Sequence, residues 1–296
     1  MEKTILDRLI EKGVNVPNPE TVYVHDDVDP DRISGNNVTL HSGCKLMGPA
    51  TLIMANTQIG IEAPVTLDNT LVGKNTELKG GYFKGAVFAG NNDFGSGAHV
   101  RAGTILEEEA NAAHTVGLKQ TILFPFVTLG SLINFCDCFM AGGTSRKDHS
   151  EVGSSFIHFN YTPNQDKATP SMIGDVPEGV MLSSRPIFLG GQGGIVGPVR
   201  LAYGCISAAG TIVRKNEFNS DRLIIGGSYR EMSIPRQCDI YKNPGHIFNN
   251  NVSYIANLMA LKAWYDHVRP LFASGEQSQA LATGLRQTLS LCIDER

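Results

Sequence analysis

Apolar side chains recur every six residues along the middle of this 296-residue chain. Glycine, asparagine or aspartate often stands a few positions after the apolar residue. A six-residue period with small residues at the corners is typical of a parallel β-helix, in which about three units complete one turn. The alternative, an antiparallel sandwich, needs a sustained period of two, which is weak here. The positions six apart are Ile59, Val65 and Leu71; Phe88, Phe94, Val100 and Leu106; Val116 and Ile122; Val127, Ile133 and Phe139; and Val199, Cys205 and Thr211. The pattern therefore predicts an all-β chain built as a single-stranded parallel β-helix.

The spacing divides the chain into three regions. We expect an N-terminal helix and lead-in over residues 1–33, the β-helix over 34–216, and a mostly helical extension over 217–296. Within the first region, apolar residues share one face of a predicted amphipathic helix over 2–12, which Gly13 ends.

The C-terminal extension has a different pattern. Apolar residues three to four apart predict a helix over 252–269, and a second helix is expected around 277–292. Residues 223–225 are a short apolar run, which is consistent with a short strand. No catalytic motif is visible in this region.

The six-residue period breaks at three polar segments, 144–149, 161–170 and 176–186. We expect loops that leave the coil at these places. Loops on a rigid scaffold are a common location for binding and catalytic residues.

Composition excludes several classes of function. A formal net charge of −4 and a pI near 6.1 argue against a general nucleic-acid binder. The longest apolar run is too short to cross a membrane, and residues 1–5 lack the apolar segment of a signal peptide. The expected protein is soluble and cytoplasmic.

Cysteine usage fits a reducing compartment. The six cysteines show no paired framework, and most are expected to be small buried side chains. Cys136 and Cys138 suggest a metal site, but on a strand they would share one face, and no second Cys/His pair follows at zinc-site spacing. No metal site is predicted.

Residues 100–216 also resemble a known family. Five motifs carry the resemblance, in the same order and at approximately the same spacing. They are Val100-Arg101-Ala102-Gly103, Val116-Gly117-Leu118-Lys119-Gln120, Phe159-Asn160-Tyr161 with Lys167 and Ile173-Gly174-Asp175, Phe188-Leu189-Gly190-Gly191 through Val199, and Ser207-Ala208-Ala209-Gly210-Thr211. They are similar to the acetyltransferase half of the bacterial bifunctional enzyme that acetylates glucosamine-1-phosphate and then uridylylates the product.

The resemblance implies a left-handed β-helix, a homotrimer, and acetyl-CoA as the co-substrate. It also implies that Arg101 and Lys119 hold the sugar phosphate, a task that suits a guanidinium fork and an ammonium point charge. Asn160 and Tyr161 would contact the N-acyl region of the sugar, and Lys167 the sugar or the acyl carrier of an adjacent subunit.

Two small residues would serve the co-substrate according to the same resemblance. Gly191 and Ala209 would offer backbone groups to the pantetheine arm of acetyl-CoA. Both also suit the tight corners that any β-helix needs.

The chain departs from the family where the family has its general base. Ser131 replaces the catalytic histidine, Asn134 replaces a sugar-binding tyrosine, and Glu151 replaces an asparagine. Ser131 and Asn134 are still expected to contact the substrate. A serine hydroxyl cannot accept a proton at neutral pH as an imidazole does. The candidates for a replacement base are His149, His158 and Glu151. On a strand, His158 would point to the same side as Asn160.

Three functions remain open. The first is acetyl transfer to an amino or hydroxyl group of a sugar phosphate or nucleotide sugar; uridylylation is not expected, because no glycine-rich nucleotidyltransferase segment is present. The second is a non-catalytic protein that binds such sugars and has lost the base. The third, a γ-class carbonic-anhydrase-like metal site, needs an H-x-x-x-x-H pair that the eight histidines do not show.

Overall fold

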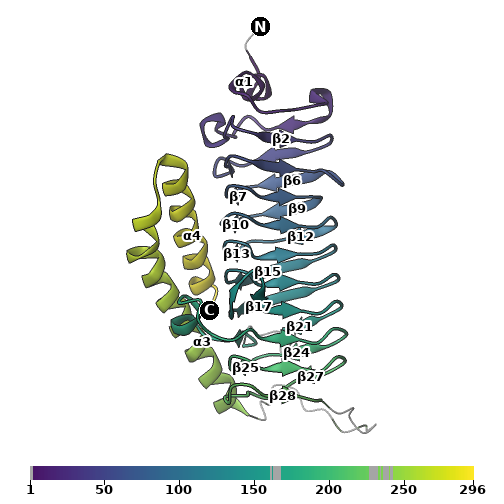
Figure 1. Ribbon diagram of the computed structural model, residues 1–296, viewed down its shortest axis with the longest axis vertical. Helices are drawn as coiled ribbons and strands as arrows, with labels where there is room; N and C mark the ends of the chain where they lie inside the picture. Colours follow the sequence, from purple (N-terminus) through teal and green to yellow (C-terminus); the bar gives the residue numbers. More distant parts are fainter. Residues whose placement is uncertain are drawn as a thin grey trace.

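Each six-residue unit forms one short strand of a coil, and three units complete one turn (Figure 1). The computed structural model describes residues 3–160, 162, 168–226, 233, 235, 240 and 243–296. Successive turns pair in parallel register and build a left-handed β-solenoid of about 11 turns. The predicted β-helix, with a short N-terminal helix and C-terminal helices, is confirmed.

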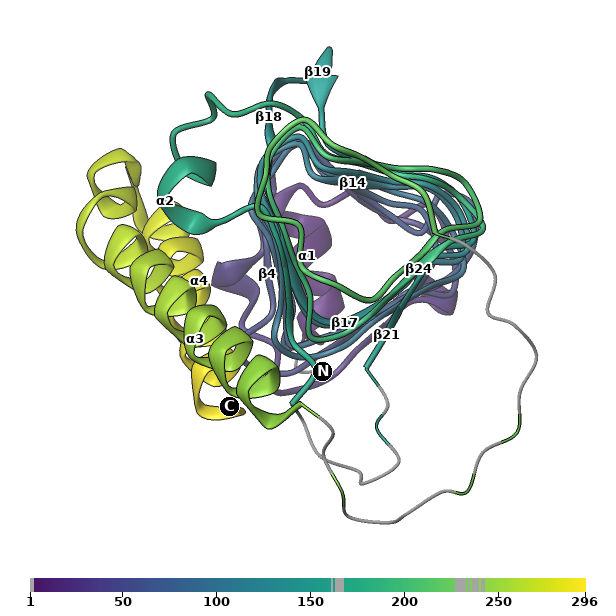
Figure 2. The ribbon, with the colours of Figure 1, turned by 90° about the horizontal axis from the view of Figure 1, so that it is seen from below.

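The coil is triangular in cross-section (Figure 2). We name its three faces by the order in which the chain crosses them. The first face consists of β1 (Tyr23–Val24), β3 (Lys45–Met47), β6 (Val65–Asp68), β9 (Gly81–Lys84), β12 (Ala98–Val100), the first halves of β15 (Gly117–Leu123) and β17 (Asn134–Met140), β21 (Ile157–Phe159), β24 (Gly194–Val196) and β27 (Ile212–Val213).

The strands of the other two faces follow in the same way. The second face consists of β4 (Leu52–Ile53), β7 (Leu71–Val72), β10 (Ala86–Phe88), β13 (Thr104–Leu106), the second halves of β15 and β17, β22 (Ser171–Ile173) and β25 (Arg200–Leu201). The third face consists of β2 (Val38–Leu40), β5 (Thr57–Ile59), β8 (Glu77–Leu78), β11 (Asp93–Phe94), β14 (Asn111–Ala112), β16 (Thr128–Leu129), β20 (Glu151–Val152), β23 (Phe188–Leu189), β26 (Ile206–Ser207) and β28 (Leu223–Ile224).

Apolar side chains fill the interior of the coil. Phe83, Phe88 and Phe94 come from the three different faces and pack edge to face, with ring centroids 5.6 to 5.7 Å apart. All three are fully buried. Edge-to-face packing adds to the free energy that the burial of each ring provides.

The corner between the second and third faces carries a ladder of asparagines. Asn37, Asn56, Asn75 and Asn91 all have φ near +50° to +60°, a conformation that asparagine adopts more readily than other non-glycine residues. Each side-chain amide donates to the next carbonyl oxygen along the ladder, at 3.1, 3.0 and 2.9 Å. The ladder therefore pairs polar groups between successive turns at the surface.

Two excursions leave the coil within the described residues, and the third expected loop, 161–170, lies mostly outside them. The hairpin of β18 (Gly143–Ser145) and β19 (Asp148–His149) projects from the corner between the second and third faces (Figure 2). Arg146 folds back from it and donates to the carbonyl oxygens of Glu109 and Phe126. The short helix α2 (Val176–Gly179) lies in the second excursion.

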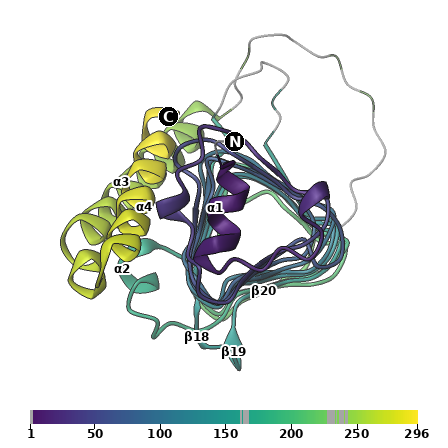
Figure 3. The same ribbon diagram turned by 90° about the horizontal axis from the view of Figure 1, so that it is seen from above.

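Helix α1 (Ile5–Lys12) lies across the N-terminal opening of the coil (Figure 3). A capping box between Thr4 and Asp7 begins the helix, and Gly13, at φ +110°, ends it. Leu9 is fully buried against the first turn. The short 3₁₀ helices η1 (Pro19–Thr21) and η2 (Pro30–Arg32) belong to the same lead-in.

Helices α3 (Pro244–His267) and α4 (Glu276–Asp294), joined by η3 (Arg269–Phe272), cover the second face (Figures 1 and 2). Helix α3 begins eight residues before the expected start at Val252. Asn243 accepts a hydrogen bond from the backbone of His246, and Pro244 occupies the first helical position, where its missing N–H costs nothing. No helix in the described part of the chain is long and apolar enough to span a membrane.

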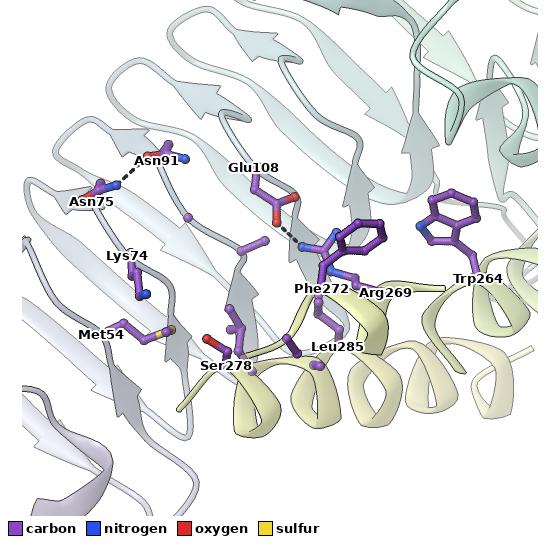
Figure 4. A pocket seen from close by; sticks show the side chains of 15 residues that line it. Met54, Lys74, Asn75, Asn91, Glu108, Trp264, Arg269, Phe272, Ser278 and Leu285 are labelled. Carbon is purple, nitrogen blue, oxygen red and sulfur yellow. Dashed lines mark hydrogen bonds and ion pairs between the residues drawn. The ribbon is translucent and has the colours of Figure 1, made fainter. Parts of the chain in front are cut away.

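A buried polar network holds the helices to the coil. The hydroxyl of Tyr265 donates to Glu107, and Arg269 pairs with both Glu107 and Glu108. Burial raises the pKa of Glu107, and Arg269 opposes that change. A groove of about 420 Å³ remains beside this network, with Trp264 and Phe272 on its wall (Figure 4).

We predict that Phe94→Ala lowers the free energy of unfolding by about 3–5 kcal/mol, because it opens a cavity inside the aromatic cluster. Asp93→Ala is the matched control, since Asp93 is the neighbouring residue of the same strand and forms only a surface ion pair with Lys79. Asp93→Ala should lower the free energy of unfolding by less than about 1 kcal/mol. Chemical denaturation followed by circular dichroism measures both, and equal losses would contradict the assignment of the core.

Candidate functional site

Two cations stand next to each other on the first face. Arg101 follows β12, and Lys119 lies beside it in β15, so the two residues belong to successive turns about 4.8 Å apart. Among the described residues, Lys119 has no hydrogen bond or ion pair through its ammonium group. In contrast, Lys84 on the same face is paired with Asp68 at 2.9 Å.

The guanidinium of Arg101 extends across the turn of Lys119. Its nearest described partner is the thiol of Cys136, with Nη2 and Sγ 3.8 Å apart. That contact is weak, and it leaves most of the guanidinium donors available. The positive charges of Arg101 and Lys119 lie on neighbouring turns and repel each other. An anion that bridges the two side chains would stabilise them.

A depression of about 420 Å³ opens beside Arg101, in the turns that also carry Lys119. It exists because Gly117, which has no side chain, stands in register between His99 on one side and Asn134 on the other. Arg101 and Leu132 border it as well. The depression and the two cations together form the candidate site.

Asp137 lies at the corner between the first and second faces, where φ is +60°. Its carboxylate accepts a hydrogen bond from the Asn160 amide at 2.9 Å and forms an ion pair with Arg296, whose side chain is 2% exposed. The bend at Asp137 corrects the expectation that Cys136 and Cys138 share a face. Cys136 points outward beside Lys119, and Cys138 points into the core.

Two of the candidate bases, His149 and Glu151, lie together but far from this site. His149 Nε2 is 3.5 Å from the Glu151 carboxylate. The hairpin that carries His149 projects from the corner opposite the first face (Figure 2). Within one chain, this pair and the two cations cannot contact the same small substrate.

The third candidate base, His158, points into the coil. The Cys136 carbonyl accepts from its Nδ1–H, and its Nε2 lies 2.7 Å from the hydroxyl of Ser171. Ser171 also accepts from the backbone of Val199 at 3.0 Å, so its own hydroxyl proton goes to Nε2. The imidazole is therefore neutral, with both nitrogens occupied. Burial lowers its pKa to about 4.

His158 thus lies inside the coil, whereas the side chain of Asn160 reaches Asp137 at the corner. The expected common side for these two residues is not observed, because the strand ends at Phe159 and Asn160 already belongs to the corner. His158 therefore stabilises the interior of the coil through its two hydrogen bonds.

Ser131, Gly191 and Ala209 lie along the corner between the third and first faces. Ser131 donates its backbone N–H to the hydroxyl of Ser154 at 3.2 Å. The carbonyl of Gly191 accepts from the backbone of Gly210 at 2.9 Å, and a Cβ at Gly191 would stand 2.8 Å from the Ser154 carbonyl. Close packing of successive turns therefore requires glycine at 191 on structural grounds.

The structure also shows what the sequence left out. Tyr161 and Lys167 lie outside the described residues. No motif marks His99, which lies two residues before Arg101; both side chains are exposed on the outside of the first face. Among the described residues, no three His, Cys, Asp or Glu side chains are grouped so that they could hold a metal ion.

This geometry is that of the left-handed β-helix proteins with hexapeptide repeats. The chain is 27% identical over 232 residues to the bifunctional protein GlmU of Nocardia farcinica, a match that covers 78% of this chain and 42% of that protein. It is 23% identical to GlmU of Thermotoga petrophila, over 71% of this chain and 42% of that protein. For GlmU of Pelobacter propionicus the identity is 25%, over 70% and 40%.

The chain thus spans about two fifths of the length of these relatives. No family model matches the sequence. The resemblance to the β-helix half of that bifunctional enzyme, first seen in the motifs, is confirmed by these similarities and by the fold.

We predict that stability falls by about 3 kcal/mol as the pH drops from 6.5 towards 4. The folded-state pKa of His158 is below its ordinary value of 6.5, so protonation favours the unfolded chain across this window. Denaturation at a series of pH values measures the change, with His158→Gln as the variant in which the slope should flatten. An NMR titration of His158 with a midpoint near 6.5 would contradict the buried, neutral assignment.

Proposed function

We propose that this protein transfers an acetyl group from acetyl-CoA to an amino group, or a hydroxyl group, of a sugar phosphate or nucleotide sugar. The observation that carries this proposal is a pair of neighbouring cations, Arg101 and Lys119, which have no ion-pair partner within the described part of the chain and lie on the first face with the depression. These cations stand at the positions where the resemblance implies a sugar-phosphate site. The proposed protein is soluble and cytoplasmic, and the transfer itself needs no metal.

The phosphate is the part of the substrate that the described residues fit best. A phosphate dianion that bridges Arg101 and Lys119 removes their mutual repulsion and accepts charge-assisted hydrogen bonds from both. The sugar ring then lies over Gly117, where no side chain competes for the space. Asn134 and Asn160 are proposed to contact the sugar, together with Tyr161 and Lys167.

Asn160 is held for such a contact. One amide N–H donates to Asp137, which orients the side chain and leaves its carbonyl oxygen and second N–H for a ligand. An acceptor in this place suits a donor such as an N–H or O–H of the sugar. The co-substrate is proposed to lie along the corner of Ser131, Gly191 and Ala209, which leads from the depression towards the C-terminal turns.

The proposed assembly is a homotrimer. Helices α3 and α4 cover the second face, so the first and third faces remain for contact between copies. The first face carries Arg101 and Lys119 and then exposed Ile157 and Phe159; the third carries acids and then exposed apolar residues. The third-face residues are Glu77, Asp93 and Glu151, followed by Phe188, Ile206 and Leu223. Both faces therefore become apolar towards the C-terminal end, which favours parallel packing of first face on third face.

A second function is supported by Ser131. A protein that keeps the phosphate site but lacks a base would bind the sugar phosphate without turnover. His149 and Glu151 could supply a base only from a neighbouring subunit, and His158 has both nitrogens occupied. The assay below separates the two functions.

We predict that the protein forms N-acetylglucosamine-1-phosphate from acetyl-CoA and glucosamine-1-phosphate, detected by mass spectrometry. Lys119→Ala should weaken calorimetric binding of the sugar phosphate about 10- to 100-fold, since a hydrogen bond to a charged group contributes roughly 1.5–3 kcal/mol. Lys84→Ala is the matched control, because it removes a lysine of the same face that is already paired.

Three outcomes are informative. Binding without product would favour the non-catalytic function. Thermal stabilisation by acetyl-CoA without product would mean a transferase with a different acceptor. Equal effects of Lys119→Ala and Lys84→Ala would contradict the proposed phosphate site.

We further predict that Phe188→Asp lowers the mass in solution from trimer to monomer, because it places a charge in the apolar part of the proposed contact. Light scattering after size-exclusion chromatography measures this. Met259→Asp is the control, since Met259 is an exposed apolar residue on α3, away from the first and third faces. A trimer that survives Phe188→Asp, or a monomeric parent protein, would refute the proposed contact.

A further inference from the structure

The depression on the first face contains a histidine that the family motifs do not mark. His99 is exposed on β12, and its ring lies 5.4 Å from that of Tyr82 in the preceding turn. It is in register with Gly117, and Gly117 is in register with Asn134. The missing side chain at 117 therefore leaves the imidazole facing open space rather than a neighbouring side chain.

His99 and Arg101 also stand in a fixed relation. Arg101 comes directly after β12, two residues from His99, so both side chains point outward about 7 Å apart. In an amino-sugar 1-phosphate, the amine is on the carbon next to the one that bears the phosphate. A phosphate held by Arg101 and Lys119 thus brings the amine to the part of the depression that His99 lines.

We propose that His99 is the general base of acetyl transfer, in place of the histidine that Ser131 replaces. This inference rests on the function proposed above and names the residue that would make it work. The amine nitrogen attacks the thioester carbonyl carbon and loses its proton to the imidazole; the new C–N bond forms and the C–S bond breaks. The CoA sulfur leaves as a thiolate and takes the proton back from the imidazolium, so the products are the N-acetyl sugar and free CoA.

The surroundings of His99 are compatible with this role. Tyr82 faces it from the preceding turn, and Arg101 lines the same depression, on the side of the proposed phosphate site. A phosphate dianion bound by Arg101 and Lys119 would place negative charge near the imidazole, which stabilises the imidazolium that forms when the amine loses its proton.

The test compares three single variants of the full chain, His99→Gln, His149→Gln and His114→Gln, in the acetyl-transfer assay with glucosamine-1-phosphate. His114 is an exposed histidine at the neighbouring corner and serves as the matched control. We expect His99→Gln to lower kcat about 100-fold or more, the usual contribution of a general base, with sugar-phosphate affinity unchanged by calorimetry. The other two variants should keep the activity of the parent protein.

A pH profile distinguishes a base from a merely structural residue. The pH profile of kcat/KM for the parent protein should have an acidic limb, and His99→Gln should lack it. Added imidazole should restore part of the activity of His99→Ala. An active His99→Gln with an unchanged profile, or a loss found in His149→Gln instead, would overturn the inference. Failure of the parent protein to acetylate would refute the proposed function itself, whatever the variants do.

Discussion

The stacking of inward-pointing apolar side chains between successive turns is the constraint on which the rest of the structure depends. It sets the length of each strand and the register of every pair, and it brings residues about eighteen apart in the sequence into contact. Phe83, Phe88 and Phe94 show this directly, because three faces each contribute one ring to a single cluster. The same register decides which outward side chains become neighbours. The packing of the core therefore also fixes the position of Arg101 beside Lys119.

Much of the fold could be predicted because its signal is local. The six-residue period fixes the β-helix, and Gly13 ends the first helix where its pattern indicates. The start of α3 lies before the periodic apolar residues that predict the helix, where a capping asparagine and Pro244 begin it. The different sides of Cys136 and Cys138 depend on one backbone angle at Asp137, which alternation along a strand cannot reveal.

The site was harder to predict, because it is assembled across turns. Resemblance supplied Arg101, Lys119 and Asn160, and all three lie on the first face or at its edge. It did not supply His99, whose importance appears only when register places Gly117 beside it. Nor did any local pattern connect the end of α4 to Asp137 through Arg296, since 159 residues separate them. Side chains such as His158, which point inward near a corner, also need the actual path of the chain.

The helix at the N-terminal opening has a consequence for the behaviour of the chain in a crowded cell. A stack of parallel strands presents unpaired backbone groups at its ends, and another strand could pair with them and extend the stack. Helix α1, anchored by the buried side chain of Leu9, lies across one of those ends. A helix offers no free strand edge with which another strand could pair. It therefore blocks the addition of strands at this end of the coil. A short helix outside the repeat thus helps to prevent the parallel strands of separate molecules from stacking into a fibre.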